Sequence, residues 1–311
     1  MKYLGYILTY SLIWGLHLLP RPLFYGISDF VYLLIRRVAG YRKKVVRENI
    51  ARAFPDFSPP EVEAIARKFY RHLCDLILES AAAHFWSEEQ INSRMSYRNT
   101  ELLERFYREG RQVIAVTAHY GNWELLSNIG SITGHTILAA YKPLKNQYFD
   151  KLIRENRERF KLATVPMDQI ARRMIRYHRD KEPALTIFLS DQRPMMHNIQ
   201  YWTRFLGQDT PLFLGAEKLA RKLEAAVVFL KIRKLARGSY EAEIVPVCDD
   251  PSTVKPYQIT ESHVRILESI IREEPAYWLW SHRRWKHSYQ EYLEKRDSSH
   301  AFRDPEGRSG V

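Results

Sequence analysis

The chain has 311 residues, and its 48 Lys and Arg against 36 Asp and Glu give a formal net charge of +12 at pH 7. Hydrophobic residues make up 45% and the mean hydropathy is −0.40, which excludes a protein with many membrane spans and allows a large soluble core. The positive charge indicates an anionic partner (nucleic acid, an anionic membrane surface, a phosphorylated lipid or an acidic carrier protein) unless the surface is simply basic.

The amino-terminal residues are strongly apolar. Residues 3–19 contain no Asp, Glu, Lys or Arg, and a second apolar stretch covers 23–35. A basic block follows, made of Arg36, Arg37, Arg42, Lys43, Lys44 and Arg47. The first run is at the short end for a spanning helix, and the positive-inside rule places the block in the cytoplasm. We expect residues 1–37 to be a membrane-anchor helix, spanning or interfacial, with a cleaved signal peptide or a buried core helix as alternatives.

Residues 38–295 are expected to form one domain, and the polar segment 296–311 to be a disordered tail. Ser58 and Glu61 form a capping box that predicts a helix from about residue 59 to 80. Further helices are predicted at 146–160, 214–223 and 260–272, strands at 113–118, 136–141 and 184–189, and a hairpin at 226–233 and 240–247. This alternation predicts an α/β fold with a mixed central β-sheet flanked by helices.

The run 113–124 ends in Ala-His-Tyr-Gly-Asn-Trp-Glu and reads as a buried strand, a tight turn and the start of a helix. His119 and Glu124 are thereby expected to fold toward each other at the carboxyl end of a strand, where ligands of α/β sheets gather. Histidine is the natural general base near neutral pH, and a carboxylate on its far nitrogen fixes the tautomer. Because the run holds no Ser or Cys, we expect His119 to activate a substrate hydroxyl. The alternative is a structural histidine.

The two cysteines, Cys74 and Cys248, lie far apart and show no metal-ligand spacing. Both are read as reduced thiols. We expect no metal and no cofactor.

Several segments match one known family in chain order. They are 47–55, 118–124, 141–146, 157–160, 190–193 (Ser-Asp-Gln-Arg), 205–207, 210–211 and 278–286. Together they resemble the bacterial lipid A biosynthesis (lauroyl/myristoyl) acyltransferases, part of the lysophospholipid acyltransferase-like superfamily. The resemblance implies a glycerol-phosphate acyltransferase-like fold and an acyltransferase domain over 38–295. Lys161 and Leu206 depart from the family's usual glycine and phenylalanine.

The resemblance also implies roles for single residues. His119 and Glu124 match the catalytic dyad. Arg157 and Asp191 match positions expected to serve the oxyanion or a substrate phosphate, with Arg159 as a near alternative to Arg157. The expected substrate-binding residues are Tyr141, Lys142, Gln192 and Arg193. Each also has a plain interpretation: a solvated helix residue for Arg157, a turn residue for Asp191 and a surface charge for Lys142. Phe205 and Leu206 suit an acyl channel or the core, and 278–286 a membrane interface or a packing segment.

The implied function is an O-acyltransferase that moves a fatty acyl chain from acyl carrier protein to a hydroxyl of a lipid A precursor at the inner membrane, with its domain in the cytoplasm. Other acceptors stay open: an aminolipid, a lysophospholipid or a phosphatidylinositol mannoside. A basic nucleic-acid-binding protein is a remote alternative that the apolar amino terminus disfavours, so no nucleic-acid partner is expected. A non-catalytic membrane scaffold is a third.

Overall fold

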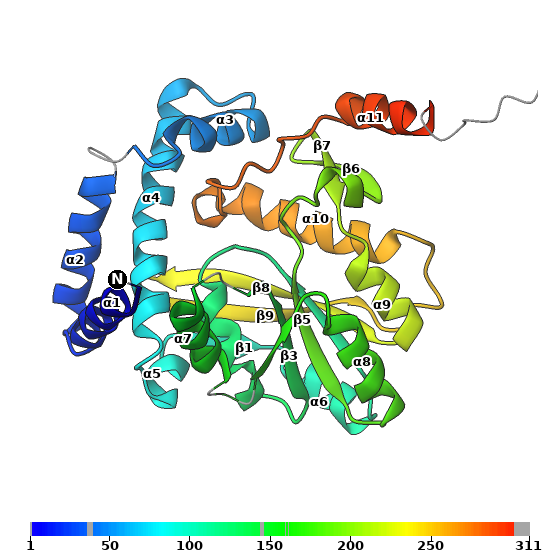
Figure 1. The fold of residues 1–311 in the computed structure, drawn as a ribbon, viewed down its shortest axis with the longest axis horizontal. Coiled ribbons are helices and arrows are strands. Elements are labelled where there is room, and N and C mark those ends of the chain that lie inside the picture. Colours follow the sequence, from blue (N-terminus) through cyan, green and yellow to red (C-terminus); the bar gives the residue numbers. More distant parts are fainter. Residues whose placement is uncertain (1, 36–39, 144–145, 159, 161, 302–311) are drawn as a thin grey trace, which may run out of the picture.

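The computed structural model describes residues 2–35, 40–143, 146–158, 160 and 162–301. Side chains at 2–4, 149, 153, 156 and 296–301 are outside that description. Seven strands form one central sheet in the order β1-β9-β8-β2-β5-β3-β4 (Figure 1). They are β1 Met95–Arg98, β2 Val113–Thr117, β3 Thr136–Tyr141, β4 Leu162–Pro166, β5 Ala184–Leu189, β8 Ala226–Ala236 and β9 Ser239–Cys248. The predicted mixed sheet flanked by helices is confirmed.

The sheet is mostly parallel. Strands β8, β2, β5, β3 and β4 run in one direction, and β9 is antiparallel to β8 but parallel to the edge strand β1. Every residue of β2 is buried, as expected for a strand covered on both faces. The carboxyl ends of β8, β2, β5 and β3 therefore meet at one edge of the sheet. Residues that follow these strands are brought together there.

Helices cover both the sheet and its carboxyl edge. They are α3 Lys43–Ala53, α4 Pro59–Ala82, α5 Glu88–Asn92, α6 Glu101–Arg108, α7 Gln147–Glu158, α8 Ile170–Arg179, α9 Gly215–Leu223 and α10 Gln258–Glu273, with 3₁₀ turns at η2 Trp123–Ser131, η3 Met196–Asn198 and η4 Pro275–Tyr277. The predicted capping box of Ser58 and Glu61 starts α4. Helix α8 packs on β5, α9 on β2 and α10 on β8. The expected helix after residue 122 is the 3₁₀ segment η2.

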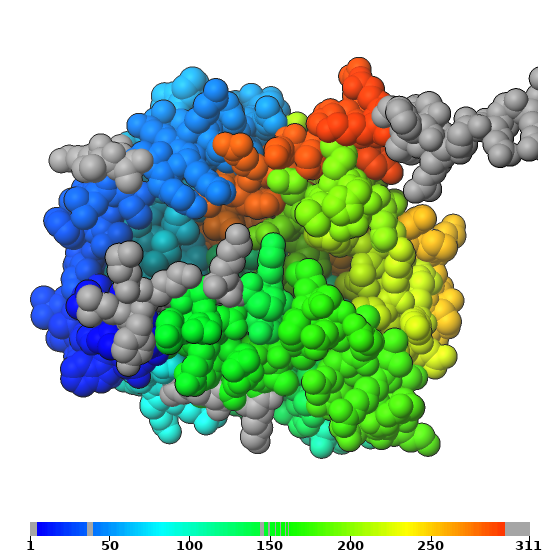
Figure 2. All heavy atoms as spheres, in the orientation of Figure 1, coloured from blue at the N-terminus to red at the C-terminus, as the bar shows by residue number. Residues whose placement is uncertain are grey.

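The amino-terminal segment forms two helices, α1 Lys2–His17 and α2 Arg21–Leu34, which lie at one side of the molecule (blue in Figure 2). Both pack on α4. Within the described residues no helix has the length and apolar character needed to cross a bilayer, so the expected spanning anchor is not supported. The reason is Pro20, which separates two short helices, and the polar bonds that fasten α2 to α4. Arg36 and Arg37 of the basic block lie outside the described residues.

Two further segments complete the chain. Strands β6 Tyr201–Phe205 and β7 Gln208–Leu212 form a separate hairpin near α10. Helix α11 spans Tyr289–Ala301 and so continues six residues into the segment expected to be disordered. The rest of that segment, 302–311, lies outside the described residues.

Candidate active site

The carboxyl ends of β2 and β5 bring together a histidine and an aspartate. The strands pair Thr117 with Leu189, so His119 and Asp191, each two residues further on, meet beyond the sheet edge. His119 Nδ1 lies 2.7 Å from Asp191 Oδ1. The prediction that a carboxylate holds the far nitrogen of His119 is therefore met by Asp191. The expectation that Glu124 fills this place is wrong.

Asp191 is held by three donors. Besides the imidazole, the backbone N–H of His119 donates to Oδ2 at 3.1 Å and the indole Nε1 of Trp278 donates to the same oxygen at 2.9 Å. The aspartate side chain is 3% exposed, whereas that of His119 is 15% exposed. An acceptor at Nδ1 favours the tautomer with its proton on Nδ1, which leaves the Nε2 lone pair for a substrate proton.

The contact between His119 and Asp191 shifts the pKa values of the two side chains in opposite directions. Burial opposes the imidazolium, but the charge and hydrogen bond of Asp191 outweigh burial and raise the pKa of His119 above its usual value. Burial would raise the pKa of Asp191, but the charge and hydrogen bond of His119, with the Trp278 indole, hold it below its usual range. Asp191 thus stays a carboxylate while His119 is a stronger base than a free imidazole.

Two side chains border the other face of His119. The Gln192 amide Nε2 lies 3.2 Å from His119 Nε2, and Trp123 meets the imidazole edge-on with ring centroids 4.9 Å apart. The amide occupies the place from which a substrate hydroxyl would give up its proton. The structure therefore brings Gln192, which the resemblance implies to be a substrate-binding residue, next to the imidazole.

Glu124 binds a different partner. Arg157 Nη2 donates to both carboxylate oxygens at 2.8 and 2.9 Å, and Nε donates at 3.2 Å. The Glu124 charge still contributes to the raised pKa of His119, after burial and Asp191. The two residues border a recess of about 50 Å³, otherwise lined largely by apolar side chains, which has room for only one or two water-sized groups. As it stands, this recess is too small for an acyl chain.

The turn between His119 and Glu124 has its own supports. Gly121 has φ +60°, and a Cβ on it would lie 2.7 Å from Ile232 Cγ2, so a larger residue does not fit. Asn122 donates from Nδ2 to the buried carboxylate of Glu79 at 2.8 Å. Glu79 also accepts hydrogen bonds from Tyr25 and Tyr240. One residue of α4 thereby fixes the turn against α2 and β9.

The other predicted residues lie at the same edge without contacting His119. Tyr141 ends β3, and Lys142 follows it as an exposed residue. Arg193 donates to the backbone carbonyl of Arg283 at 3.1 Å and lies 2.7 Å from the His287 ring. The alternative residue Arg159 lies outside the described part of the chain.

Two segments, one weighed for an acyl channel and the other for a membrane interface, are largely core. Phe205 and Leu206 are buried, and Phe205 packs against Trp278. In the segment 278–286, Trp278, Trp280 and Arg284 are buried, whereas Arg283 and Lys286 are exposed. The packing interpretation holds for these buried residues.

Sequence reasoning missed three supports of the site. Trp278 holds Asp191, Glu79 holds the turn, and Arg284 lies buried behind Asp191, where burial lowers the pKa of its guanidinium to about 10 against the opposing charge of Asp191. Glu79 lies in an apolar stretch of α4. A carboxylate on a buried helix face is the signal that could have identified it from the sequence.

The chain is similar to known proteins along most of its length. The family model for bacterial lipid A biosynthesis acyltransferases matches residues 1–287. The lipid A biosynthesis palmitoleoyltransferase of Escherichia coli (strain K12) is 24% identical over 269 residues, 86% of each chain. The lipid A biosynthesis acyltransferase of Haemophilus influenzae is 25% identical over 273 residues, again 86% of each chain. The lipid A biosynthesis lauroyltransferase of E. coli (strain K12) is 23% identical over 282 residues, 89% of each chain.

Proposed function

The chain belongs to the bacterial lipid A biosynthesis acyltransferase family and is an acyltransferase, and from this premise we propose that it transfers a fatty acyl chain from acyl carrier protein to a hydroxyl of a lipid A precursor. The observation that carries the proposal is the His119–Asp191 pair at the sheet edge, with Nε2 of the imidazole turned to Gln192. Among the described residues, the side chains that hydrogen-bond the imidazole are those of Asp191 and Gln192, and neither is a nucleophile, which suits direct attack by a substrate hydroxyl on an acyl donor.

The reaction follows from this geometry. The acceptor hydroxyl displaces the Gln192 amide and gives its proton to His119 Nε2 as its oxygen attacks the thioester carbonyl. Asp191 holds the Nδ1 proton and stabilises the imidazolium that forms. The tetrahedral intermediate then collapses: the C–S bond breaks, the new C–O ester bond remains, and His119 returns the proton to the thiolate.

Arg157 and Glu124 act together in this proposal. Arg157 is a permanent planar donor, and the bidentate bond to Glu124 fixes its direction beside the site. We assign it to the oxyanion or to a substrate phosphate. Glu124 then serves catalysis through Arg157 and through its charge near His119, not as the partner of the imidazole.

Membrane association is the second part of the proposal. Helix α1 exposes Leu8 and Leu12, one turn apart, and α2 exposes Phe30 and Leu34, also one turn apart. Exposed apolar pairs on a chain of net charge +12 suit a helix pair lying in the interface of an anionic bilayer, with the domain on the cytoplasmic side. The same positive charge would attract an acidic carrier protein.

The test is transfer in vitro, with defined acyl carrier and coenzyme A thioesters against a panel of lipid acceptors, and with the product identified by mass. We expect one added acyl chain on a lipid A precursor. Transfer to an aminolipid, a lysophospholipid or a phosphatidylinositol mannoside instead would replace the acceptor. His119→Ala and Glu124→Ala should give folded proteins without activity, and full activity in His119→Ala would end the mechanism.

A further inference from the structure

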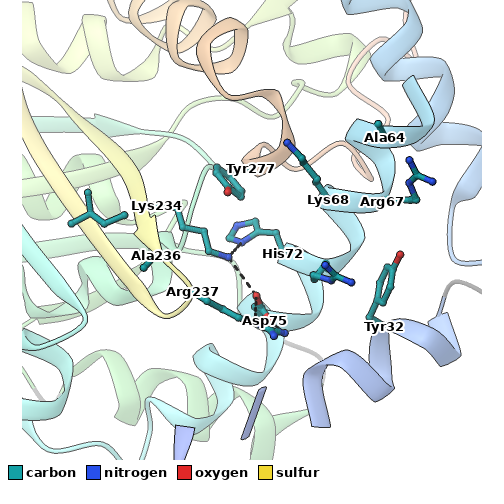
Figure 3. Close-up of a pocket in the computed structure, with 12 residues that line it drawn as sticks. Tyr32, Ala64, Arg67, Lys68, His72, Asp75, Lys234, Ala236, Arg237 and Tyr277 are labelled. Atoms are coloured by element: carbon teal, nitrogen blue, oxygen red, sulfur yellow. Dashed lines mark hydrogen bonds and ion pairs between the residues drawn. The ribbon is translucent and has the colours of Figure 1, made fainter. Parts of the chain in front are cut away.

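A basic pocket lies outside the His119 site. It has a volume of about 600 Å³ and opens between α2, α4, η4 and the β8–β9 hairpin (Figure 3). Its size is typical of small-molecule sites, and the acyl-transfer mechanism does not use it. It shares the catalytic edge of the sheet, because β8 is parallel to β2. It also contacts the catalytic turn: Gly121 donates to the Tyr277 carbonyl at 3.0 Å, and His72 Nε2 lies 3.2 Å from the Gly121 carbonyl oxygen.

The pocket has a large excess of positive charge. Five cationic side chains line it: Arg67, Lys68, Arg71, Lys234 and Arg237. Asp75 is the one carboxylate in the described lining, and Asp29 lies behind it as a second partner of Arg237 and a weaker partner of Arg71, at 3.7 Å. Five cations against two carboxylates leave three positive charges uncompensated. An anion is the ligand that such a pocket selects.

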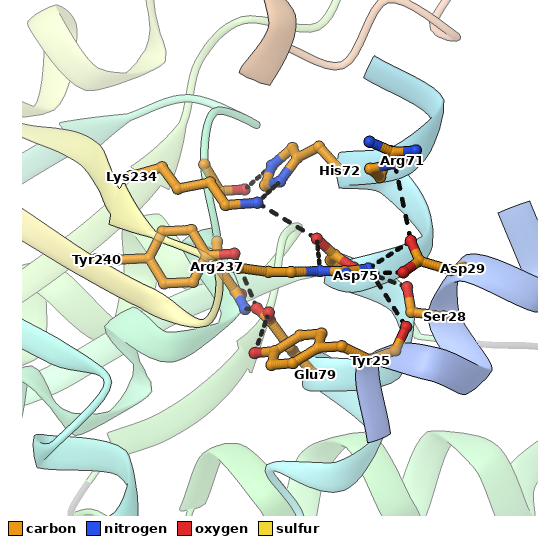
Figure 4. Close-up of polar contacts among 12 residues, drawn as sticks. Tyr25, Ser28, Asp29, Arg71, His72, Asp75, Glu79, Lys234, Arg237 and Tyr240 are labelled. Atoms are coloured by element: carbon orange, nitrogen blue, oxygen red, sulfur yellow. Dashed lines mark hydrogen bonds and ion pairs between the residues drawn. The ribbon is translucent and has the colours of Figure 1, made fainter. Parts of the chain in front are cut away.

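The cations differ in how they are used. Arg237 is fully engaged, with Nη2 2.7 Å from Asp75 and 2.9 Å from Asp29 (Figure 4). Arg67 and Lys68 are exposed, and among the described residues neither has a hydrogen-bonding or ionic partner. Arg67 stands one turn before Arg71 on the same face of α4, an arrangement of like charges that weakens a helix. A bound anion would relieve this repulsion.

Lys234 is a preorganised cation at the bottom of this cluster. Its side chain is 10% exposed, and its ammonium lies 3.4 Å from Asp75, 3.3 Å from His72 Nδ1 and 5.3 Å from the centre of the Tyr277 ring. These partners hold the ammonium in place before a ligand arrives. Little side-chain entropy of Lys234 is therefore lost when an anion binds. A held ammonium together with the exposed cations of Arg67 and Lys68 is an arrangement suited to a phosphate.

The shape and the neighbours of the pocket favour a lipid phosphate. A recess receives a compact phosphate, whereas a docking helix of a carrier protein, about 10 Å wide, needs an open face. Helix α2 lines the pocket with Tyr32 and exposes Phe30, 61% accessible, on another side. One helix can therefore enter the bilayer interface while the pocket lies at the level of the lipid head groups.

We propose that this pocket binds a phosphate monoester of a phosphorylated lipid head group at the membrane surface. The inference rests on the proposed function in one respect: the bound lipid is taken to be the acyl acceptor or a lipid next to the acceptor. Bound there, the head group is anchored at the same sheet edge as His119. The pocket would thus select acceptors that carry a phosphate monoester.

The test is vesicle binding by the full chain, which needs no acyl transfer. Vesicles of phosphatidylcholine with phosphatidate are compared with phosphatidylcholine vesicles that carry phosphatidylglycerol at equal surface charge. The wild type should prefer phosphatidate. The double variant Arg67→Gln/Lys68→Gln should lose that preference and bind phosphatidate vesicles about tenfold or more weakly. Both residues are exposed, so the variant should fold, which circular dichroism checks.

The matched control is Arg172→Gln/Arg173→Gln on α8, which removes the same charge from exposed residues outside the pocket. It should keep the preference for phosphatidate. Equal losses in both double variants, no preference in the wild type, or inorganic phosphate alone binding as tightly as the vesicles would overturn the inference. So would intact vesicle binding with a raised KM for acyl carrier protein, which would assign the pocket to the donor.

These outcomes are separable from those of the proposed function. An enzyme that acylates lipid A precursors while Arg67→Gln/Lys68→Gln leaves vesicle binding unchanged would overturn the pocket and leave the function standing. A protein that transfers no acyl chain but shows the phosphatidate preference would overturn the proposed function and leave the pocket assignment standing.

Discussion

At the scale of single residues, the site depends on two carboxylates with separate partners. Asp191 holds His119, and Glu124 holds Arg157. Sequence spacing suggested Glu124 as the partner of His119, because these two residues are close in the chain whereas Asp191 is 72 positions away from His119. Only the adjacency of β2 and β5 brings Asp191 to the imidazole, and strand order is not written in the spacing of residues.

The first prediction concerns Asp191→Asn. The amide keeps the shape but removes the charge, and because the two N–H donors at Oδ2 need its single oxygen, its NH2 group then faces His119 Nδ1 and favours the wrong tautomer, so kcat should fall roughly 10³-fold or more. Because Asp191 raises the pKa of His119 against burial, removing it should lower that pKa. The base then stays deprotonated to lower pH, and the acidic limb of the kcat/KM profile should move to lower pH.

Glu124→Gln is the comparison for this experiment. Its charge makes a smaller contribution to the pKa of His119, so the acidic limb should move less than in Asp191→Asn. Activity is still expected to fall, because Arg157 loses its ion pair. An acidic limb that stays in place in Asp191→Asn would mean that Asp191 does not set the basicity of His119.

At the scale of elements, the catalytic turn depends on Gly121, where a larger residue does not fit. Gly121→Ala places a Cβ 2.7 Å from Ile232 Cγ2 and forces an alanine to φ +60°. The left-handed conformation costs about 1–2 kcal/mol and the overlap about as much again, so unfolding in urea should become about 3 kcal/mol easier.

The double variant Gly121→Ala/Ile232→Ala separates the two costs. Removing Cγ2 takes away the overlap and leaves the backbone cost, so the two substitutions should couple favourably by about 1 kcal/mol in a double-mutant cycle. Strict additivity would show that the overlap is absorbed by movement of the β8 strand.

A second element-scale prediction concerns Glu79. It joins α2, α4, β9 and the catalytic turn by accepting from Tyr25, Tyr240 and Asn122. Glu79→Ala leaves three buried donors without their acceptor and should cost about 3 kcal/mol or more of unfolding free energy. Tyr25→Phe removes one bond and should cost about 1 kcal/mol. Equal losses in the two variants would contradict a shared acceptor.

Burial explains which helices and strands could be predicted from the sequence. The strands β2, β3 and β5 and the β8–β9 hairpin were predicted closely, since each is rich in apolar residues and bounded by turn residues. The edge strands β1 and β4 were missed because their burial pattern is mixed, whereas the equally short β2 is buried throughout. The amino-terminal helices misled because apolar length alone does not distinguish a span from helices packed on α4.

At the scale of the whole molecule, several histidines scattered through the fold are buried or half-buried, which favours the neutral ring. Burial lowers the pKa of His72 to about 3, with the Lys234 charge adding to the effect. It lowers that of His135 and of His263 to about 4, and that of His282 also to about 4, where Arg284 adds to the effect. In the unfolded chain these rings regain an ordinary pKa near 6.5.

The last prediction is that the protein loses stability steeply as the pH falls from about 6.5 toward 4. A group whose pKa is lower in the folded state contributes stability above its unfolded pKa and loses it as the pH falls, because the unfolded chain then binds more protons. Each such histidine contributes at most about 1.4 kcal/mol per pH unit. The raised pKa values of His119 and Glu79 act in the opposite sense and reduce the slope of stability against pH.

Urea unfolding at a series of pH values measures this slope. His263→Gln removes one buried ring and should make the slope shallower by about one histidine's share, whereas His178→Gln, an exposed position on α8, should leave it unchanged. Equal slopes in the wild type and His263→Gln would mean that this ring takes up a proton in the folded protein as readily as in the unfolded chain.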